Sequence, residues 1–322
     1  MKRAIRTIVL SMVLFFTIPQ SALAAQLLVP GGQLVGLELS NDTVTVAAFD
    51  DSCGAAAREA GLQIGDQILA VDGKAVSTAE DVRRALKDCG DQVELAVLRG
   101  SKRLNLRLTP SEVKEGKRLG VYLRQGIAGV GTVTFYDPET DTFGTLGHGV
   151  SDGKGNLLCM TDGRACDATV ASVKKGKSGD PGQLRGSADA EELLGKITKN
   201  TPQGVFGRSP RGIPGEPLPV AAYEDIHTGS ATIRSTVSGD SVREYSVEIL
   251  KIYPKDRSDC RNYLIKVTDP ELLKLTGGIV QGMSGSPIIQ DGKLIGAVTH
   301  VLVNSPDTGY GIFIENMLDA AA

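Results

Sequence analysis

The stretch GMSGSPIIQDGKLIGAVTHV, residues 282–301, places two serines in a glycine-rich turn and follows them with two apolar runs. The runs predict a strand, a turn and a second strand. Glycine and serine are common in turns, because glycine adopts positive φ and serine hydrogen-bonds locally. The stretch therefore predicts β structure and leaves open whether Ser284 is a nucleophile or only a turn residue.

The composition of the whole chain is that of a globular protein. Its 322 residues suggest two domains, and 41% of them are hydrophobic and 23% charged. The net charge is −3 and no long basic run follows the first residues, which argues against nucleic acid as a partner. Glycine is abundant, with 39 residues, and β-branched residues recur in short runs. This pattern favours many short strands.

The N-terminus has the layout of a secretory signal. Three basic side chains in the first six residues precede an apolar run at 8–18 and small residues at 19–24. The run is shorter than the roughly 20 residues that a transmembrane helix needs. We expect residues 1–25 to be a signal peptide or an N-terminal membrane anchor, so that the rest of the protein acts outside the cytoplasm.

The cysteines predict neither a metal site nor a cofactor. Five cysteines are an odd number for an exported chain, so at least one thiol stays free or pairs between molecules. Cys159 and Cys166 are close in sequence but have no histidine nearby. We expect no metal and no cofactor.

Residues 26–110 read as a small α/β unit. Strands are expected at 44–49, 68–71, 93–98 and 103–108, and a short helix at 55–60. A second helix begins after Ser77 or Thr78, which can cap it, and carries Val82 and Leu86 at helical spacing.

The segment AGLQIGDQILAVDGKAV, residues 60–76, resembles a PDZ domain. The resemblance implies that the unit binds peptides or chain termini by strand addition. The stretch VPGGQLVGLEL, residues 29–39, would supply the binding loop and an edge strand containing Leu37, and Val82 and Leu86 would line the groove. The alternative is a domain that only packs against its neighbour.

Residues 111–322 look mainly β, as a barrel or a sandwich. Strands are expected at 119–123, 128–136, 168–173, 229–237 and 242–253. The region 174–219 is rich in glycine, proline and lysine, and we expect surface loops there around a short helix near Glu191.

Three histidines, His148, His227 and His300, are available as a base for a hydrolytic serine. His148 lies between two glycines, where bare backbone lets substrate or another loop approach the ring. His227 lies in a loop without such surroundings, and His300 ends an apolar strand. The sequence favours His148.

The stretches TFGTLGHGVSD, residues 142–152, and GGIVQGMSGSP onward, residues 277–318, resemble the stage IV sporulation B (SpoIVB) peptidase family. The element around Ser284 also resembles that of chymotrypsin-like serine peptidases. The SpoIVB resemblance implies an N-terminal apolar segment, a PDZ domain at 26–110 and a serine peptidase domain at 111–322. The expected fold is mainly β with minor α, with a PDZ domain followed by a chymotrypsin-like double β-barrel.

The resemblance also assigns roles to residues. Ser284 would be the nucleophile and His148 the general base, and the backbone N–H groups of Gly282 and Ser284 would form the oxyanion hole. The specificity pocket would be lined by Ala297, Thr299 and His300.

The acid of the triad is harder to assign. The order His, Asp, Ser leaves several aspartates between His148 and Ser284, and the resemblance implies Asp269, with Asp225 in reserve. Asp269 precedes Pro270 and is equally a good helix N-cap.

The expected function is an exported serine endopeptidase of sporulation signalling. The family implies self-cleavage, and cleavage of a membrane-associated regulator between mother cell and forespore so that an intramembrane protease can act on a late sigma factor. The PDZ domain would recognise the enzyme itself or its target. The alternative is a non-catalytic PDZ scaffold with an inactive peptidase-like domain.

Overall fold

The computed structural model describes residues 26–114, 116–152 and 155–322. The expected signal peptide or anchor, residues 1–25, lies outside the described residues. Within the described part of the chain, no helix combines the length and the apolar character needed to cross a bilayer. All five cysteines fall within the described ranges, and each carries a free thiol.

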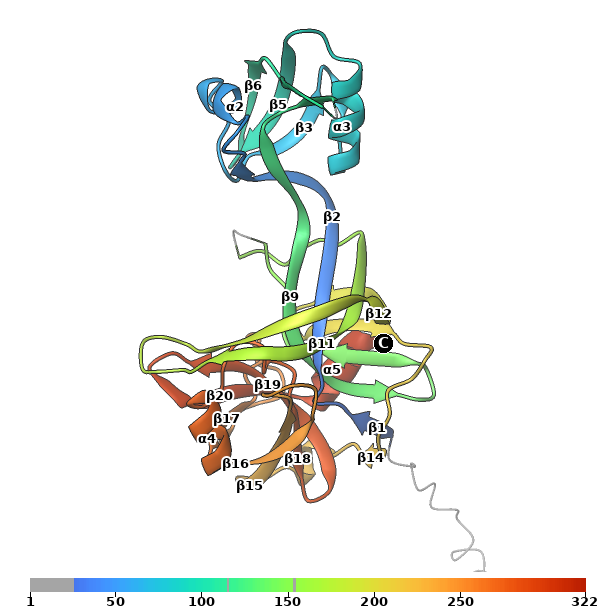
Figure 1. Ribbon diagram of the computed structural model, residues 1–322. Helices are drawn as coiled ribbons and strands as arrows, with labels where there is room; N and C mark the ends of the chain where they lie inside the picture. Colours follow the sequence, from blue (N-terminus) through green and yellow to red (C-terminus); the bar gives the residue numbers. More distant parts are fainter. Residues whose placement is uncertain (1–25, 115, 153–154) are drawn as a thin grey trace, which may run out of the picture.

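The C-terminal part of the chain forms a closed β-barrel of six strands (Figure 1). The strands are β15 (Gly229–Ser235), β16 (Arg243–Ile252), β17 (Tyr263–Val267), β18 (Pro287–Gln290), β19 (Lys293–Leu302) and β20 (Ser305–Phe313). Alternate residues of β16, namely Tyr245, Val247 and Ile249, are buried, as expected for a strand with one face on a core. Two helices, α4 (Pro270–Thr276) and α5 (Ile314–Ala321), follow β17 and β20.

The other barrel, called the first barrel below because it begins earlier in the chain, is formed by strands that are far apart in sequence. The C-terminal barrel of β15–β20 is called the second barrel. The first barrel consists of β2 (Leu34–Phe49), β9 (Val121–Asp137), β10 (Thr142–Thr145), β13 (Gly204–Arg208), β12 (Gln183–Thr201) and β11 (Asp162–Lys174). The ring closes because β9 pairs with β10 and also with β2. Strand β1 (Leu27–Pro30) continues this sheet between β9 and β14 (Leu218–Pro219), and a short 3-10 helix, η1 (Tyr223–Asp225), follows. The expected double β-barrel of the chymotrypsin-like type is confirmed.

The expectation of surface loops and a helix within 174–219 was wrong. The structure has the long strand β12 there, followed by β13. The middle of β12 is exposed on both faces, so its sequence lacks the apolar alternation that marks a strand. Leu194 and Ile197, near its end, are buried in the first barrel.

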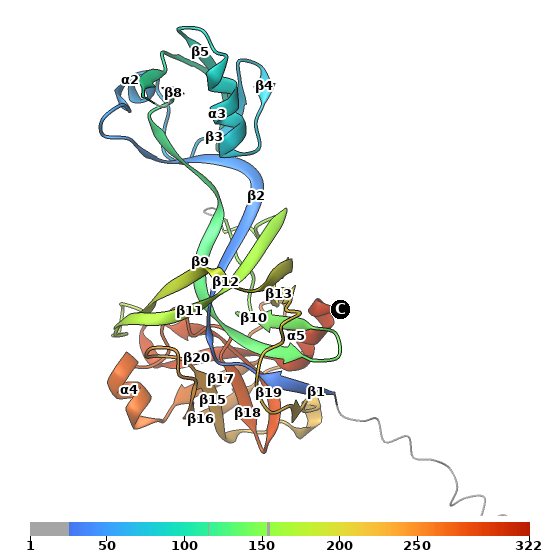
Figure 2. The same ribbon diagram turned by 45° about the vertical axis from the view of Figure 1, so that its right-hand side comes forward.

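The PDZ unit lies at the far end of a two-stranded ribbon made by β2 and β9, which rise side by side out of the first barrel (Figures 1 and 2). The unit contains α2 (Ala55–Glu59), β3 (Gln67–Val71), β4 (Lys74–Ala75), α3 (Ala79–Lys87), β5 (Val93–Arg99) and β6 (Lys102–Leu108). The hairpin of β7 (Ser111–Val113) and β8 (Gly116–Arg118) leads back to β9. Thr78, one of the two caps that the sequence allowed, begins α3 and forms a full capping box with Asp81.

The structure places the domain boundaries differently from 26–110 and 111–322. Residues 34–39 of β2 pair with β9 and β11 inside the first barrel, whereas residues 44–49 of the same strand belong to the PDZ unit. Strand β9 crosses back in the same way, with residues 121–125 in the PDZ unit and 127–137 in the barrel. The PDZ domain is therefore an insertion within one strand pair of the peptidase barrel, which a linear division could not represent.

We expect Gly126→Val to destabilise the protein, because Gly126 lies where the ribbon leaves the barrel. Its φ is +82°, and a Cβ there would lie 2.0 Å from the carbonyl oxygen of Leu39. A side chain forced into this conformation costs about 1–3 kcal/mol. The apparent melting temperature should fall by about 2–4 °C for each kcal/mol. The matched control is Gly129→Ala, on the same strand, where a Cβ meets nothing within 4 Å. Equal melting temperatures for the two variants would contradict the argument.

Candidate active site

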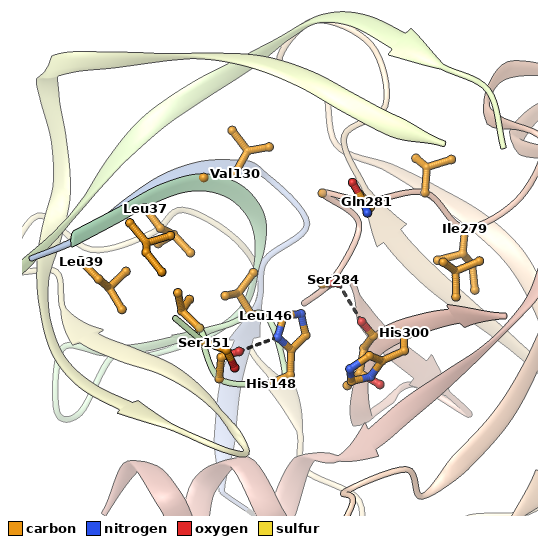
Figure 3. A pocket seen from close by; sticks show the side chains of 18 residues that line it. Leu37, Leu39, Val130, Leu146, His148, Ser151, Ile279, Gln281, Ser284 and His300 are labelled. Carbon is orange, nitrogen blue, oxygen red and sulfur yellow. Dashed lines mark hydrogen bonds between the residues drawn. The ribbon is translucent and has the colours of Figure 1, made fainter. Parts of the chain in front are cut away.

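A pocket of about 590 Å³ lies between the two barrels and contains both Ser284 and His148 (Figure 3). The first barrel contributes an apolar wall, which includes Leu37, Leu39, Val130 and Leu146. The second barrel contributes Ile279, Gln281, Ser284 and His300. The pocket therefore brings together the two residues on which the sequence prediction depends.

Buried threonines of the first barrel hold the serine turn in place. The backbone N–H of Thr132 donates to the Ser284 carbonyl at 2.9 Å, and its Oγ1 donates to the Gly282 carbonyl at 2.8 Å. Thr134 Oγ1 donates to the Gly285 carbonyl, also at 2.8 Å. Sequence reasoning missed these threonines, although their i, i+2 spacing in an apolar strand places both side chains on one face.

The turn itself depends on two glycines with positive φ. Gly282 has φ +99° and Gly285 has φ +97°. A Cβ on Gly285 would lie 2.0 Å from the carbonyl oxygen of Thr132, so only glycine fits against the first barrel here. Among the described residues, the N–H groups of Gly282 and Ser284 have no hydrogen-bond acceptor. These two amides are therefore available to an oxyanion, and their role as the oxyanion hole stays a prediction.

The Ser284 hydroxyl donates to the backbone carbonyl of Thr299 at 2.7 Å. Because this bond occupies its proton, Ser284 is at rest in this conformation. Rotation of the side chain away from Thr299 is needed before a base can take the proton.

His148 is held as a neutral base by its own loop. Its Nδ1 lies 3.0 Å from the carbonyl oxygen of Gly149. Since a carbonyl only accepts, Nδ1 carries the proton and Nε2 keeps its lone pair. Burial lowers the pKa of the imidazole below 6.5. Gly147, at φ +67°, allows this loop to approach the second barrel, because a Cβ there would lie 2.9 Å from Thr299 Cγ2.

Of the three residues expected in the specificity pocket, Thr299 and His300 line the site. Ala297 is completely buried in β19, where it pairs with Pro287 and belongs to the core. The His300 ring lies 5.1 Å from the His148 ring, centroid to centroid, with 39° between the planes. Burial and the nearby His148 lower the pKa of His300 to about 4.

Asp269 lies at the start of α4 and caps that helix. Its Oδ1 accepts from the Leu272 N–H at 2.9 Å, and its Oδ2 accepts from the Ser246 N–H at 3.3 Å. No hydrogen bond joins Asp269 to His148, although both residues are described. Its assignment as the triad acid stays a prediction, and the contacts in this conformation do not support it.

The other candidates are also engaged elsewhere. Asp225, the reserve acid, accepts from Lys293 Nζ at 2.7 Å. His227 Nε2 lies 2.9 Å from Asp291 Oδ2 on the surface. Of the described residues that line the pocket, none is an aspartate or a glutamate.

The expected peptide-binding residues of the PDZ unit need correction. Leu37 lies in the first barrel and lines the peptidase pocket, because residues 34–39 pair with β9 and β11 there. Val82 and Leu86 are 1% and 3% exposed and belong to the core of the PDZ unit.

Residues 121–125 of β9 form one edge strand of the PDZ unit, at the end of the sheet opposite to β6. They pair with β2 on one side, and no other described strand pairs with them. Helix α3 lies close to this strand. The segment follows Gly120, whose φ is +71°. The apolar alternation of Leu119, Val121 and Leu123 is the sequence signal that could have identified it.

Comparisons with known proteins agree with both units. The family model described as SpoIVB peptidase S55 matches residues 115–318, and a PDZ domain model matches residues 54–99. The serine protease HTRA1 of Xenopus tropicalis is 38% identical over 58 residues, which are 18% of this chain and 13% of that protein. The chain therefore spans only a small part of that curated relative.

Two solved structures were also similar. The PDZ domain of an SdrC-like protein from Listeria monocytogenes is 26% identical and covers 26% of this chain and 87% of that chain, with a TM-score of 0.22. The active form of the Rv3671c protease from M. tuberculosis is 18% identical and covers 61% of this chain and 75% of that chain, with a TM-score of 0.36. Since the first family match spans well over half of the chain and includes His148 and Ser284, the chain belongs to the SpoIVB peptidase S55 family.

Proposed function

We propose that this serine peptidase is an exported endopeptidase of sporulation signalling, which cleaves itself and a membrane-associated regulator. The observation that carries the catalytic part is the shared pocket of Ser284 and His148, with two unpaired amides beside the serine. The basic and apolar N-terminal segment supports export to the space between mother cell and forespore. The PDZ unit supports a peptide or protein partner, in cis or in trans.

The reaction begins when the Ser284 hydroxyl leaves the Thr299 carbonyl. In Figure 3 the second nitrogen of the His148 ring points to the Ser284 side of the pocket. This nitrogen, Nε2, takes the hydroxyl proton while the serine oxygen attacks the scissile carbonyl. The amides of Gly282 and Ser284 stabilise the oxyanion, and His148 then returns the proton to the leaving amine.

Labelling with a fluorophosphonate tests the proposal. Wild-type chain without residues 1–25 should be labelled and should cleave itself, whereas Ser284→Ala should do neither, because the nucleophile is gone. His148→Ala should lose at least 100-fold in labelling rate, since a general base contributes about 10²–10⁴. His227→Ala is the matched control and should behave as wild type, because His227 lies outside the pocket. An unlabelled wild type would favour the alternative of a non-catalytic PDZ scaffold.

The rate should depend on pH through His148. The imidazole accepts a proton only when it is neutral, and burial lowers its pKa. The labelling rate should therefore remain high down to pH 6.5 and fall only below that value. His300, with a pKa of about 4, stays neutral over most of this range. A rate profile whose acid midpoint lies above 6.5 would contradict the buried, neutral base.

The variant Asp269→Asn distinguishes a role of Asp269 as a helix cap from a role as the triad acid. Asparagine caps a helix about as well as aspartate but cannot also accept from the Ser246 N–H, so the melting temperature should fall only slightly. If Asp269 only caps α4, as its contacts indicate, the labelling rate should stay within about threefold of wild type. Asp269→Ala should cost about 1 kcal/mol of stability through the lost cap. A large loss of rate in Asp269→Asn at a nearly unchanged melting temperature would instead establish Asp269 as the acid.

A further inference from the structure

His300 contacts the catalytic base from a strand that is locally irregular. The register of β19 against β20 shifts between Val298, which pairs with Gly311, and His300, which pairs with Tyr310. Thr299 is the extra residue of this bulge. In a regular strand alternate residues face opposite sides, yet Thr299 and His300 both line the pocket. The bulge therefore aims His300 into the site while Thr299 presents its carbonyl to Ser284.

The His300 ring lies against the His148 ring. The centroid distance of 5.1 Å falls within the range of packed aromatic pairs. Figure 3 shows both rings in the same part of the pocket, below Ser284. Within the described part of the chain, neither nitrogen of His300 makes a hydrogen bond. Its one ring contact is to the base.

The remaining restraint on His148 is weak. Its Nδ1 donates to the carbonyl of Gly149, the next residue in the same loop. A local bond of this kind fixes the tautomer but leaves the ring free to tilt about it. No carboxylate among the described residues lines the pocket, so the ring lacks the usual third partner. A neighbouring ring on its face supplies the missing restraint.

The charge of His300 is compatible with this role. Burial and the proximity of His148 keep it neutral at neutral pH. The charged groups nearest to it have opposite signs. They are Arg261, which lies over the Tyr310 ring, and Asp259. A neutral ring places no positive charge beside His148 when the base takes the serine proton.

We propose that His300 is a positioning residue for the catalytic base, packing against His148 so that Nε2 stays directed at Ser284. This inference rests on the proposed function and differs from a role of His300 in the specificity pocket. A specificity role would act on substrate binding. A positioning role acts on the chemical step.

The test uses the full-length chain and a fluorophosphonate, whose labelling at saturation separates the binding constant KI from the chemical rate constant kinact. We expect His300→Ala and His300→Gln to lower kinact about tenfold, since misplacing a catalytic group by about 1 Å can cost roughly 100-fold. KI should stay within about twofold. His300→Phe keeps a ring against His148 and should retain kinact within about threefold of wild type.

The pH profile gives a second measure. In His300→Ala water reaches the face of His148, which raises the pKa of this group toward 6.5 and moves the acid midpoint of kinact to higher pH. His300→Phe should leave the midpoint in place. Unchanged kinact in His300→Ala, an equal loss in His300→Phe, or a change confined to KI would each overturn this inference. An unlabelled wild type would overturn the proposed function itself.

Discussion

Two threonine hydroxyls of β9 donate to carbonyls of the serine turn, and this contact between barrels determines the geometry of the site. Thr132 and Thr134 are completely buried, as is Thr145, whose Oγ1 donates to the Thr132 carbonyl at 2.7 Å. A buried hydroxyl or carbonyl left without its partner costs about 1–3 kcal/mol. The second barrel therefore cannot shift against the first without breaking several such bonds. The nucleophile is fixed by the barrel that carries the base, so the pocket exists only when both barrels are joined.

The same strand links the site to the PDZ unit. Strand β9 begins as one edge of that unit at residues 121–125 and bends at Gly126. It then lines the pocket at Gly129 and Val130 before reaching Thr132. Strand β2 runs in the opposite direction, from the barrel to the PDZ unit, and Leu37 on it lines the pocket. The PDZ unit and the peptidase pocket are thus joined by one pair of strands, whose register shifts between Leu39 and Val44.

How well the sequence predicted each feature depended on how far apart in sequence the contacting residues lie. The sequence indicated Ser284 and His148, which line one pocket, because the glycines that shape their loops are adjacent in sequence. Leu37 was misplaced because its role depends on pairing with β9 and β11, about 90 and 130 residues away. The strand β12 was missed because its exposed middle carries no apolar alternation. Asp269 illustrates a different limit, since Asp before proline fits both a helix cap and a catalytic acid, and only three-dimensional contacts distinguish the two.

The absence of a carboxylate among the described lining residues changes what the base requires. In a Ser-His-Asp triad, the acid fixes the imidazole tautomer, orients the ring and stabilises the cation that forms. Here the Gly149 carbonyl fixes the tautomer at Nδ1, and it offers a partial negative charge where the acid would offer a full one. Burial lowers the pKa of His148, so the imidazole is neutral at rest and needs no full negative charge beside it in this state. The orientation of the His148 ring then depends on packing, and the ring of His300 is the aromatic group that packs against it. In the mechanism proposed above, the work of a triad acid is divided between a backbone carbonyl and a second histidine.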